Sequence, residues 1–150
     1  MCEYCGCQNV DVIAELTAEH DALRDLGREL GLAADAGDLV RAGDLARRML
    51  AVLGPHTAVE EGGLFPALAD QFAEPIAALV DEHRAIEPVL TGLAAGTPTA
   101  DWPTSVHTVL NTLFEHILKE QDGVFPAALA MLSAADWDAV ASARRAEVGT

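Results

Sequence analysis

The stretch His116-Ile117-Leu118-Lys119-Glu120 determines how the rest of the chain can be interpreted. A histidine and a carboxylate four residues apart lie about one turn apart on the same face of a helix. Burying both groups costs free energy unless they are paired, and a metal ion is one such partner. Apolar residues recur at helical spacing around the pair and place it in an inward-facing stripe: Val106, Val109, Leu113, Ile117 and Val124.

The same pattern occurs earlier in the chain. His56 and Glu60 form a second H-x-x-x-E motif, and a Gly-Leu/Val-Phe-Pro segment follows each of the two motifs. The pair Glu19-His20 likewise resembles Glu82-His83. The matching residues are 60 and 63 positions apart, so the two repeats are nearly in register. Two similar helical hairpins packed against each other form a four-helix bundle with approximate twofold symmetry.

Composition and charge narrow the class of protein. The 150 residues are 51% hydrophobic and show no alternating β-branched runs, which favours one all-α domain with a substantial core. The formal net charge of -15 argues against nucleic acid or an anionic membrane as a partner, because both attract clustered Lys and Arg. No apolar run reaches the roughly 18 to 20 residues of a membrane span.

The N-terminal sequence MCEYCGC carries neither the basic nor the apolar region of a secretory signal. Its three cysteines are an odd number crowded at one end, which does not make a disulfide framework. We therefore expect a cytoplasmic protein. It should consist of a Cys-rich head at residues 1–8 and one folded domain at residues 9–150.

The expected fold is an up-down-up-down four-helix bundle with a short extra C-terminal helix. The first helix should run from about Val10 to Ala34, with Asn9 or Asp11 as its cap. Pro66 is expected to kink or break the second helix. Later helices should start at residues that favour a helix N-terminus: Pro75, Asp101 with Pro103, and the capping box from Ser133 to Asp136.

The four repeated histidines pass a geometric test for lying in one layer. In an antiparallel hairpin, two residues at the same height are equidistant from the turn between them. The midpoints between successive histidines fall on turn-forming or polar sequence, at Asp38, Ala69-Asp70-Gln71 and Thr99-Ala100. Loop chemistry does not depend on the histidines, so it independently supports one layer that holds His20, His56, His83 and His116.

These histidines, with Glu60 and Glu120, offer six nitrogen or oxygen ligands from four helices. One ion is crowded by this set, whereas two ions bridged by the carboxylates use all of it. Imidazole and carboxylate without thiolate point to iron, with manganese or zinc as alternatives. The competing interpretation is a set of hydrogen-bonded core histidines that hold no metal.

At residues 10–132, with His20, His83 and the two H-x-x-x-E motifs, the sequence resembles the hemerythrin-like, or HHE, cation-binding domains. The resemblance implies a non-haem centre of two iron ions, bridged by Glu60 and Glu120 and by an oxo or hydroxo group. His83 and His116 would hold one iron. His20 and His56 would hold the other and leave a position open for a small ligand.

Glu87 departs from the family pattern. Oxygen-carrying hemerythrins place a histidine four residues after the match to His83, where this chain has a carboxylate. As a ligand, Glu87 would make the set more anionic, favour ferric iron and weaken reversible oxygen carriage. As alternatives, it accepts a hydrogen bond from a ligand imidazole or faces solvent.

Other polar residues are expected to have lesser roles. Glu61 should face solvent, since it lies about 140° from His56 around an α-helix. His107 should also lie on the surface. Glu19 and Glu82 could contact the ligand histidines from outside, and the two tryptophans at helix starts should be packing residues: Trp102 and Trp137.

Cys2, Cys5 and Cys7 represent separate chemistry. Three thiols cannot close a tetrahedral zinc site alone. A fourth ligand could come from His107 or from a second chain, or the thiols respond to oxidants, or the head is simply a reactive tail.

The preferred function is therefore a di-iron protein that reacts with or senses hydrogen peroxide, dioxygen or nitric oxide, with a role in oxidative stress. The first alternative is an iron donor or redox sensor that acts through a protein partner, because iron–sulfur cluster repair proteins share this pattern of histidines and glutamates. In that case the Cys-rich head would be the contact. The second alternative is reversible oxygen binding, against which Glu87 argues.

Overall fold

The computed structural model describes the backbone of residues 7–148 and the side chains of residues 11–147. Every regular element in this part of the chain is a helix, which confirms the all-α prediction. The long helices are α1 (Cys7–Ala36), α2 (Leu39–Val59), α4 (Ala73–Ala94) and α5 (Trp102–Lys119). The shorter elements are α3 (Phe65–Leu68), α6 (Phe125–Met131), α7 (Ala134–Val148) and two π-helical turns, η1 (Glu60–Leu64) and η2 (Glu120–Val124).

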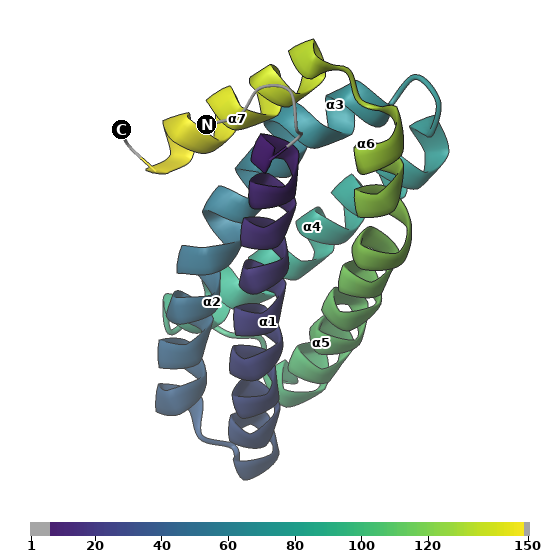
Figure 1. The fold of residues 1–150 in the computed structure, drawn as a ribbon. Helices are drawn as coiled ribbons and strands as arrows, with labels where there is room; N and C mark the ends of the chain where they lie inside the picture. Colours follow the sequence, from purple (N-terminus) through teal and green to yellow (C-terminus); the bar gives the residue numbers. More distant parts are fainter. Residues whose placement is uncertain (1–6, 149–150) are drawn as a thin grey trace.

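The four long helices lie side by side, and each packs against two of the others (Figure 1). α1 contacts α2 and α5, and α4 contacts the same two helices. α7, yellow in Figure 1, instead crosses the end at which α1 begins and packs against η1, α2 and α1. Across residues 7–148, no helix combines the length and the apolar character that crossing a bilayer requires.

The turn between α1 and α2 lies where the sequence predicts it. Gly37 adopts a φ of +66°, a conformation that costs a glycine little. Asp38 then caps α2 by accepting a hydrogen bond from the backbone N–H of Arg41 at 3.1 Å. The turn brings α1 and α2 back along each other, so residues of the two helices can meet at one height.

The start of the first helix was predicted wrongly. α1 begins at Cys7, so both expected caps, Asn9 and Asp11, lie inside it. Either residue costs a position inside a helix only a fraction of a kcal/mol, so neither interrupts the helix. Two residues of the Cys-rich head, Cys7 and Gln8, therefore belong to α1, whereas Cys2 and Cys5 lie outside the described residues.

The C-terminal helix begins with the predicted capping box. The backbone N–H of Ser133 donates to Oδ2 of Asp136 at 3.0 Å, and the N–H of Asp136 donates to Oγ of Ser133 at 3.1 Å. Two donors at the helix end are thereby satisfied. Trp137, next in the chain, is buried as a packing residue, as predicted.

The buried apolar side chains form two separate clusters with polar residues between them. Along α1, Leu16 belongs to one cluster and Leu23 to the other, and the buried His20 lies between them. Along α4, His83 separates Leu79 from Ile86 in the same way. The candidate site therefore occupies a polar layer across the middle of an apolar interior.

Candidate metal centre

Six buried side chains meet in this layer and form two groups that could each hold a metal ion. Within a group, one potential ligand atom from each residue lies within 4.8 Å of the others. Both groups include Glu60 and Glu120. One group adds His20 and His56, and the other adds His83 and His116. The structure thus brings together six of the seven residues that the sequence selects.

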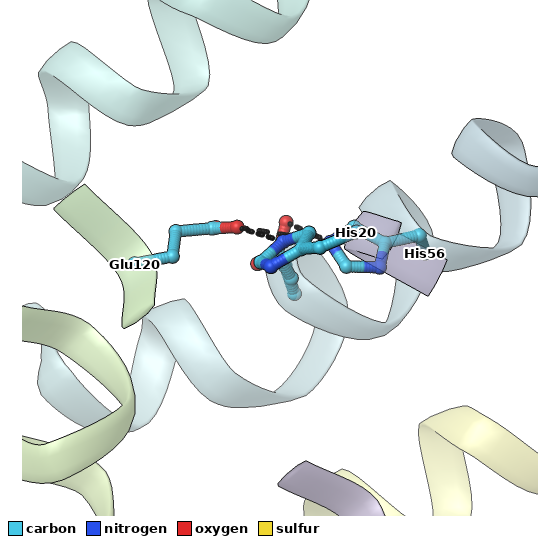
Figure 2. A group of neighbouring side chains, drawn as sticks. His20, His56 and Glu120 are labelled. Atoms are coloured by element: carbon cyan, nitrogen blue, oxygen red, sulfur yellow. Dashed lines mark hydrogen bonds and ion pairs between the residues drawn. The ribbon is translucent and has the colours of Figure 1, made fainter. Parts of the chain in front are cut away.

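The two carboxylates lie between the two pairs of histidines. Oε1 of Glu60 is 3.3 Å from Nε2 of both His56 and His83. Oε1 of Glu120 is 2.8 Å from Nε2 of His20, and its Oε2 is 3.3 Å from Nε2 of His116. Figure 2 shows Glu120 reaching across to the rings of His20 and His56. Each carboxylate therefore faces one histidine from each group, as a bridging ligand would.

The other ring nitrogen of every histidine has an acceptor outside the layer. These acceptors are carboxylate or amide oxygens, so a hydrogen on each Nδ1 would satisfy them and would leave each Nε2 free to bind a metal. This tautomer is the one that a metal site with Nε2 ligands requires. The Nδ1 contacts are His20 with Gln121 at 3.0 Å, His56 with Glu19 at 2.9 Å, His83 with Glu61 at 2.8 Å and His116 with Glu82 at 2.9 Å.

Two π-helical turns explain the Phe-Pro segments that follow each H-x-x-x-E motif. Phe65 N–H donates to the carbonyl of Glu60, five residues earlier, and Phe125 N–H donates to Glu120 in the same way. In an α-helix, a residue five positions on would point about 140° away. The wider turn puts each phenylalanine on the same face as its glutamate, which is a common use of such turns at functional sites. The chain continues helically through Pro66, so of the two predicted outcomes, a kink or a break, the break does not occur.

The phenylalanines complete the layer from the opposite repeat. Phe125 stacks on the ring of His20, with centroids 5.4 Å apart and planes 6° from parallel. Phe65 stacks on His83 at 5.9 Å and 14°. Each repeat therefore supports a histidine of the other, so the two halves of the sequence interlock at the site.

Burial and charge give the two central carboxylates opposite protonation behaviour. Burial, together with the negative charge of Glu120, raises the pKa of Glu60 above 4.5. Burial also opposes ionisation of Glu120, but its interactions with Glu60 and with the imidazoles of His116 and His20 hold the pKa of Glu120 well below its usual range.

The residues present fit a metal ion because several buried atoms lack any other partner. Within the described part of the chain, Nε2 of His56, both oxygens of Glu60 and Oε2 of Glu120 have no hydrogen-bond partner. A buried polar atom without a partner is costly. Cations placed between these atoms would satisfy all of them, which a purely hydrogen-bonded histidine core does not.

Glu87 lies outside both groups. It is half-buried, one turn after His83, and lines a surface hollow with Arg84, Pro88 and Thr91. In this arrangement the seventh residue selected from the sequence is not among the potential ligands.

The structure contradicts the prediction for Glu61 and confirms the prediction for His107. Glu61 was expected to face solvent, but its Oε2 accepts a hydrogen bond from Nδ1 of His83 at 2.8 Å. The expectation was wrong because it considered only α2 and not the neighbouring α4. His107 is exposed, as predicted, and pairs with Asp35 at 2.8 Å. It lies near the end of α1 opposite to Cys7, about 40 Å away at 1.5 Å per residue, so it is not a zinc partner for Cys7 of the same chain.

Sequence reasoning missed several residues around the layer. Gln121 aligns with Glu61 in the repeat, and this alignment was a usable signal for its contact with His20. Arg144 gave no such signal, because it lies in α7 and meets Glu19 from 125 residues away. Glu19 accepts hydrogen bonds from both His56 and Arg144, which overcome the opposing effect of burial and lower its pKa from 4.5 to about 2.

Comparison with known proteins identifies the family. A family model described as the hemerythrin HHE cation binding domain matches residues 11–128. Neither the curated proteins nor the solved structures include a match to the chain. The matched range holds all six residues of the two groups, and α7 follows it. The chain therefore belongs to the hemerythrin family of HHE cation-binding domains.

Proposed function

We propose that the protein binds two iron ions, with Glu60 and Glu120 as bridging ligands. One ion would be held by His20 and His56, and the other by His83 and His116. The observation that carries this proposal is that both carboxylates belong to both groups of ligand atoms. The packing of the long helices supports an up-down-up-down four-helix bundle with α7 as its extra helix.

The chemistry of the ligand atoms supports iron as the metal. The layer offers imidazole nitrogens and carboxylate oxygens and no thiolate, a set that suits iron better than softer metals. Each group supplies two histidines and two shared carboxylates, which is fewer ligands than the roughly six of an octahedral ion. Each ion would therefore keep open positions for a small molecule.

When bound, iron would supply the redox chemistry, and the protein would control what reaches it. The apolar clusters on both sides of the layer restrict water. A mostly apolar pocket of about 360 Å³ has Leu79 and Val124 among its walls. These residues lie one turn from His83 and Glu120, so a small neutral molecule can be held near the layer. We propose hydrogen peroxide, dioxygen or nitric oxide as the reactant, in a reducing cytoplasm.

Reversible oxygen binding is less well supported. The position that holds a histidine in oxygen-carrying relatives is Glu87 here, and Glu87 lies outside both groups. The ion held by His83 and His116 would then have one imidazole fewer than in an oxygen carrier. The iron-donor alternative depends on Cys2, Cys5 and Cys7 and stays a prediction.

The direct test begins with the metal. Elemental analysis and Mössbauer spectra of the purified protein should give two irons per chain in a coupled centre. The anaerobic ferrous protein is then mixed separately with each of the three reactants while the optical spectrum is followed. His56→Ala should abolish the response, and His107→Ala, which removes an exposed histidine, should preserve it. A wild-type protein that responds to none of the three would contradict the proposed reactivity.

A further inference from the structure

The C-terminal helix reaches the candidate centre from outside the matched family domain. Family similarity ends at residue 128, whereas α7 spans Ala134–Val148. Trp137 and Val140 of α7 are buried in the apolar cluster at this end of the molecule. α7 is therefore part of the folded core and not a loosely attached extension.

α7 approaches the π-helical turn that follows Glu60 unusually closely. A Cβ atom added to Gly63 would lie 2.9 Å from Cα of Val140, closer than real Cβ contacts allow. Gly63 is thus required for the two backbones to meet, and it lies three residues after a bridging carboxylate. Any shift of α7 is transmitted directly to η1, because no flexible side chain separates the two backbones.

A second connection runs through side chains. Nη1 and Nη2 of Arg144 donate to the two oxygens of Glu19 at 3.1 and 2.8 Å, and Nε of Arg144 lies 2.9 Å from Oε2 of Glu15. The side chains of Arg144 and Glu19 are only 18% and 19% exposed, so this forked pair is largely shielded from water. Glu19 in turn accepts the hydrogen bond from Nδ1 of His56 at 2.9 Å.

We propose that α7 strengthens metal binding at the half of the centre formed by His20 and His56, with Arg144 as a positioning residue that fixes Glu19 and, through it, the ring of His56. The proposal rests on the metal-binding function proposed above. It implies a reciprocal effect, because two coupled events must stabilise each other equally. A metal ion at this half should therefore hold α7 more firmly against η1.

The direction in which the metal affinity changes when Arg144 is removed distinguishes a positioning role of Arg144 from a purely electrostatic one. Arg144 draws negative charge away from Glu19, so by charge alone its removal would make His56 a stronger ligand. Loss of positioning has the opposite effect, because a mobile Glu19 no longer holds the ring in its binding orientation. Losing an acceptor of this kind typically weakens metal binding about 10-fold to 100-fold. A fall in affinity indicates positioning, and a rise indicates charge.

The experiment uses Co²⁺ as a probe of the metal-free, full-length protein, followed by calorimetry and by the visible bands of the bound ion. Arg144→Leu should weaken one of the two sites by up to about 10-fold, since Glu19 itself remains, and Arg144→Lys should recover part of the loss. Lys119→Met is the counterpart of Arg144→Leu in the other half, because it removes the cation that contacts Glu82 at 2.6 Å. Arg48→Leu, at an exposed position of α2, removes the same charge elsewhere and should change neither site.

A separate readout follows α7 itself. Hydrogen exchange over residues 134–148 should slow when Co²⁺ binds to the wild type, and this protection should shrink in Arg144→Leu. Trp137 fluorescence in a Trp102→Phe background reports the same docking, since Trp137 is buried in α7. If two Co²⁺ sites form but Arg144→Leu leaves both unchanged or tighter, the inference is overturned and the proposed function stands. If the wild type binds fewer than two ions, both are overturned.

Discussion

The two halves of the centre have nearly the same inner ligands but different surroundings. In each half, two histidines face the same two carboxylates. Outside the layer, His20 contacts the neutral Gln121, whereas His83 contacts the carboxylate of Glu61. The remaining acceptors, Glu19 and Glu82, are each paired with a cation. Among the four acceptors that contact the Nδ1 atoms, the half with His83 and His116 thus has one more carboxylate than the other half.

This difference shows that a repeated sequence need not make two equal metal sites. An anionic acceptor at Nδ1 makes an imidazole a better ligand than an amide acceptor does. We therefore expect the ion held by His83 and His116 to bind more tightly, and to favour the higher oxidation state more, than the ion held by His20 and His56. The four predictions below test or refine this inequality.

The largest effect should come from removing what the two halves share. Glu120→Ala takes one ligand from both ions. Both ions should therefore be lost, and no difference in affinity between the two sites should remain. At metal concentrations about 100 times the Kd, the lost binding corresponds to about 2.7 kcal/mol of stability for each ion. Elemental analysis and melting curves with and without metal measure the two losses. Glu115→Ala, at an exposed position of α5, is the control, and normal metal content in Glu120→Ala would refute the bridging role.

Exchanging the acceptors at Nδ1 of His20 and His83 should change which of the two sites binds metal more tightly. Glu61→Gln should weaken the tighter site about 10-fold, and Gln121→Glu should strengthen the weaker one by a similar factor. The double variant should reverse the order, because it moves the extra charge from His83 to His20. Calorimetric titration with Co²⁺ gives both affinities. Two sites that stay in their original order in the double variant would show that the outer charge does not set the difference.

The metal-free protein should lose stability as the pH rises, whereas the metal-loaded protein should not. Burial disfavours charge on the imidazoles of His56, His83 and His116, but the facing carboxylates overcome this and raise each pKa above 6.5. A raised pKa adds stability below pH 6.5 that is lost as pH rises through the folded value. The melting temperature without metal should therefore fall above pH 6.5, by a few degrees. With Zn²⁺ bound it should not fall, since the ion replaces these protons. Parallel curves would contradict this prediction.

The smallest effect is expected at Glu87. Because this residue lies outside both groups, Glu87→Ala should change metal content and Co²⁺ affinity by less than about twofold. His83→Ala, one turn earlier on α4, should lose an ion. Loss of an ion from Glu87→Ala would restore the ligand role that the sequence suggested and would give the half with His83 and His116 a further ligand.

Much of the fold and the centre could be predicted from the sequence, because helices keep regular spacing. The distances of His20 and His56 from the turn at Gly37 fix their relative height, and the structure brings their rings to 4.7 Å. The π-helical turns could not be predicted, because reasoning from α-helical angles excludes them. Such angles missed the placement of Phe65 and Phe125 over the histidines of the other repeat.

Residues that act across large sequence distances were also beyond prediction. Arg144 meets Glu19 only because α7 folds back over η1, and nothing near Arg144 in the sequence announces that contact. Glu87 is a different case. The residue follows His83 by four positions, as a ligand pair does, but the rotation of α4 decides which of the two faces the layer, and rotation depends on packing against neighbours.

The division of the apolar interior affects how the protein melts. Two apolar clusters, one around Leu30 and one around Trp137, lie on either side of a layer of buried polar groups. These polar groups favour contact with water when no ion is present. Bound ions, as proposed, would link these two clusters into one cooperative unit. Without ions, each cluster can open at its own temperature, so a single sharp calorimetric peak should broaden or split. The metal would then couple the unfolding of the two ends of the molecule.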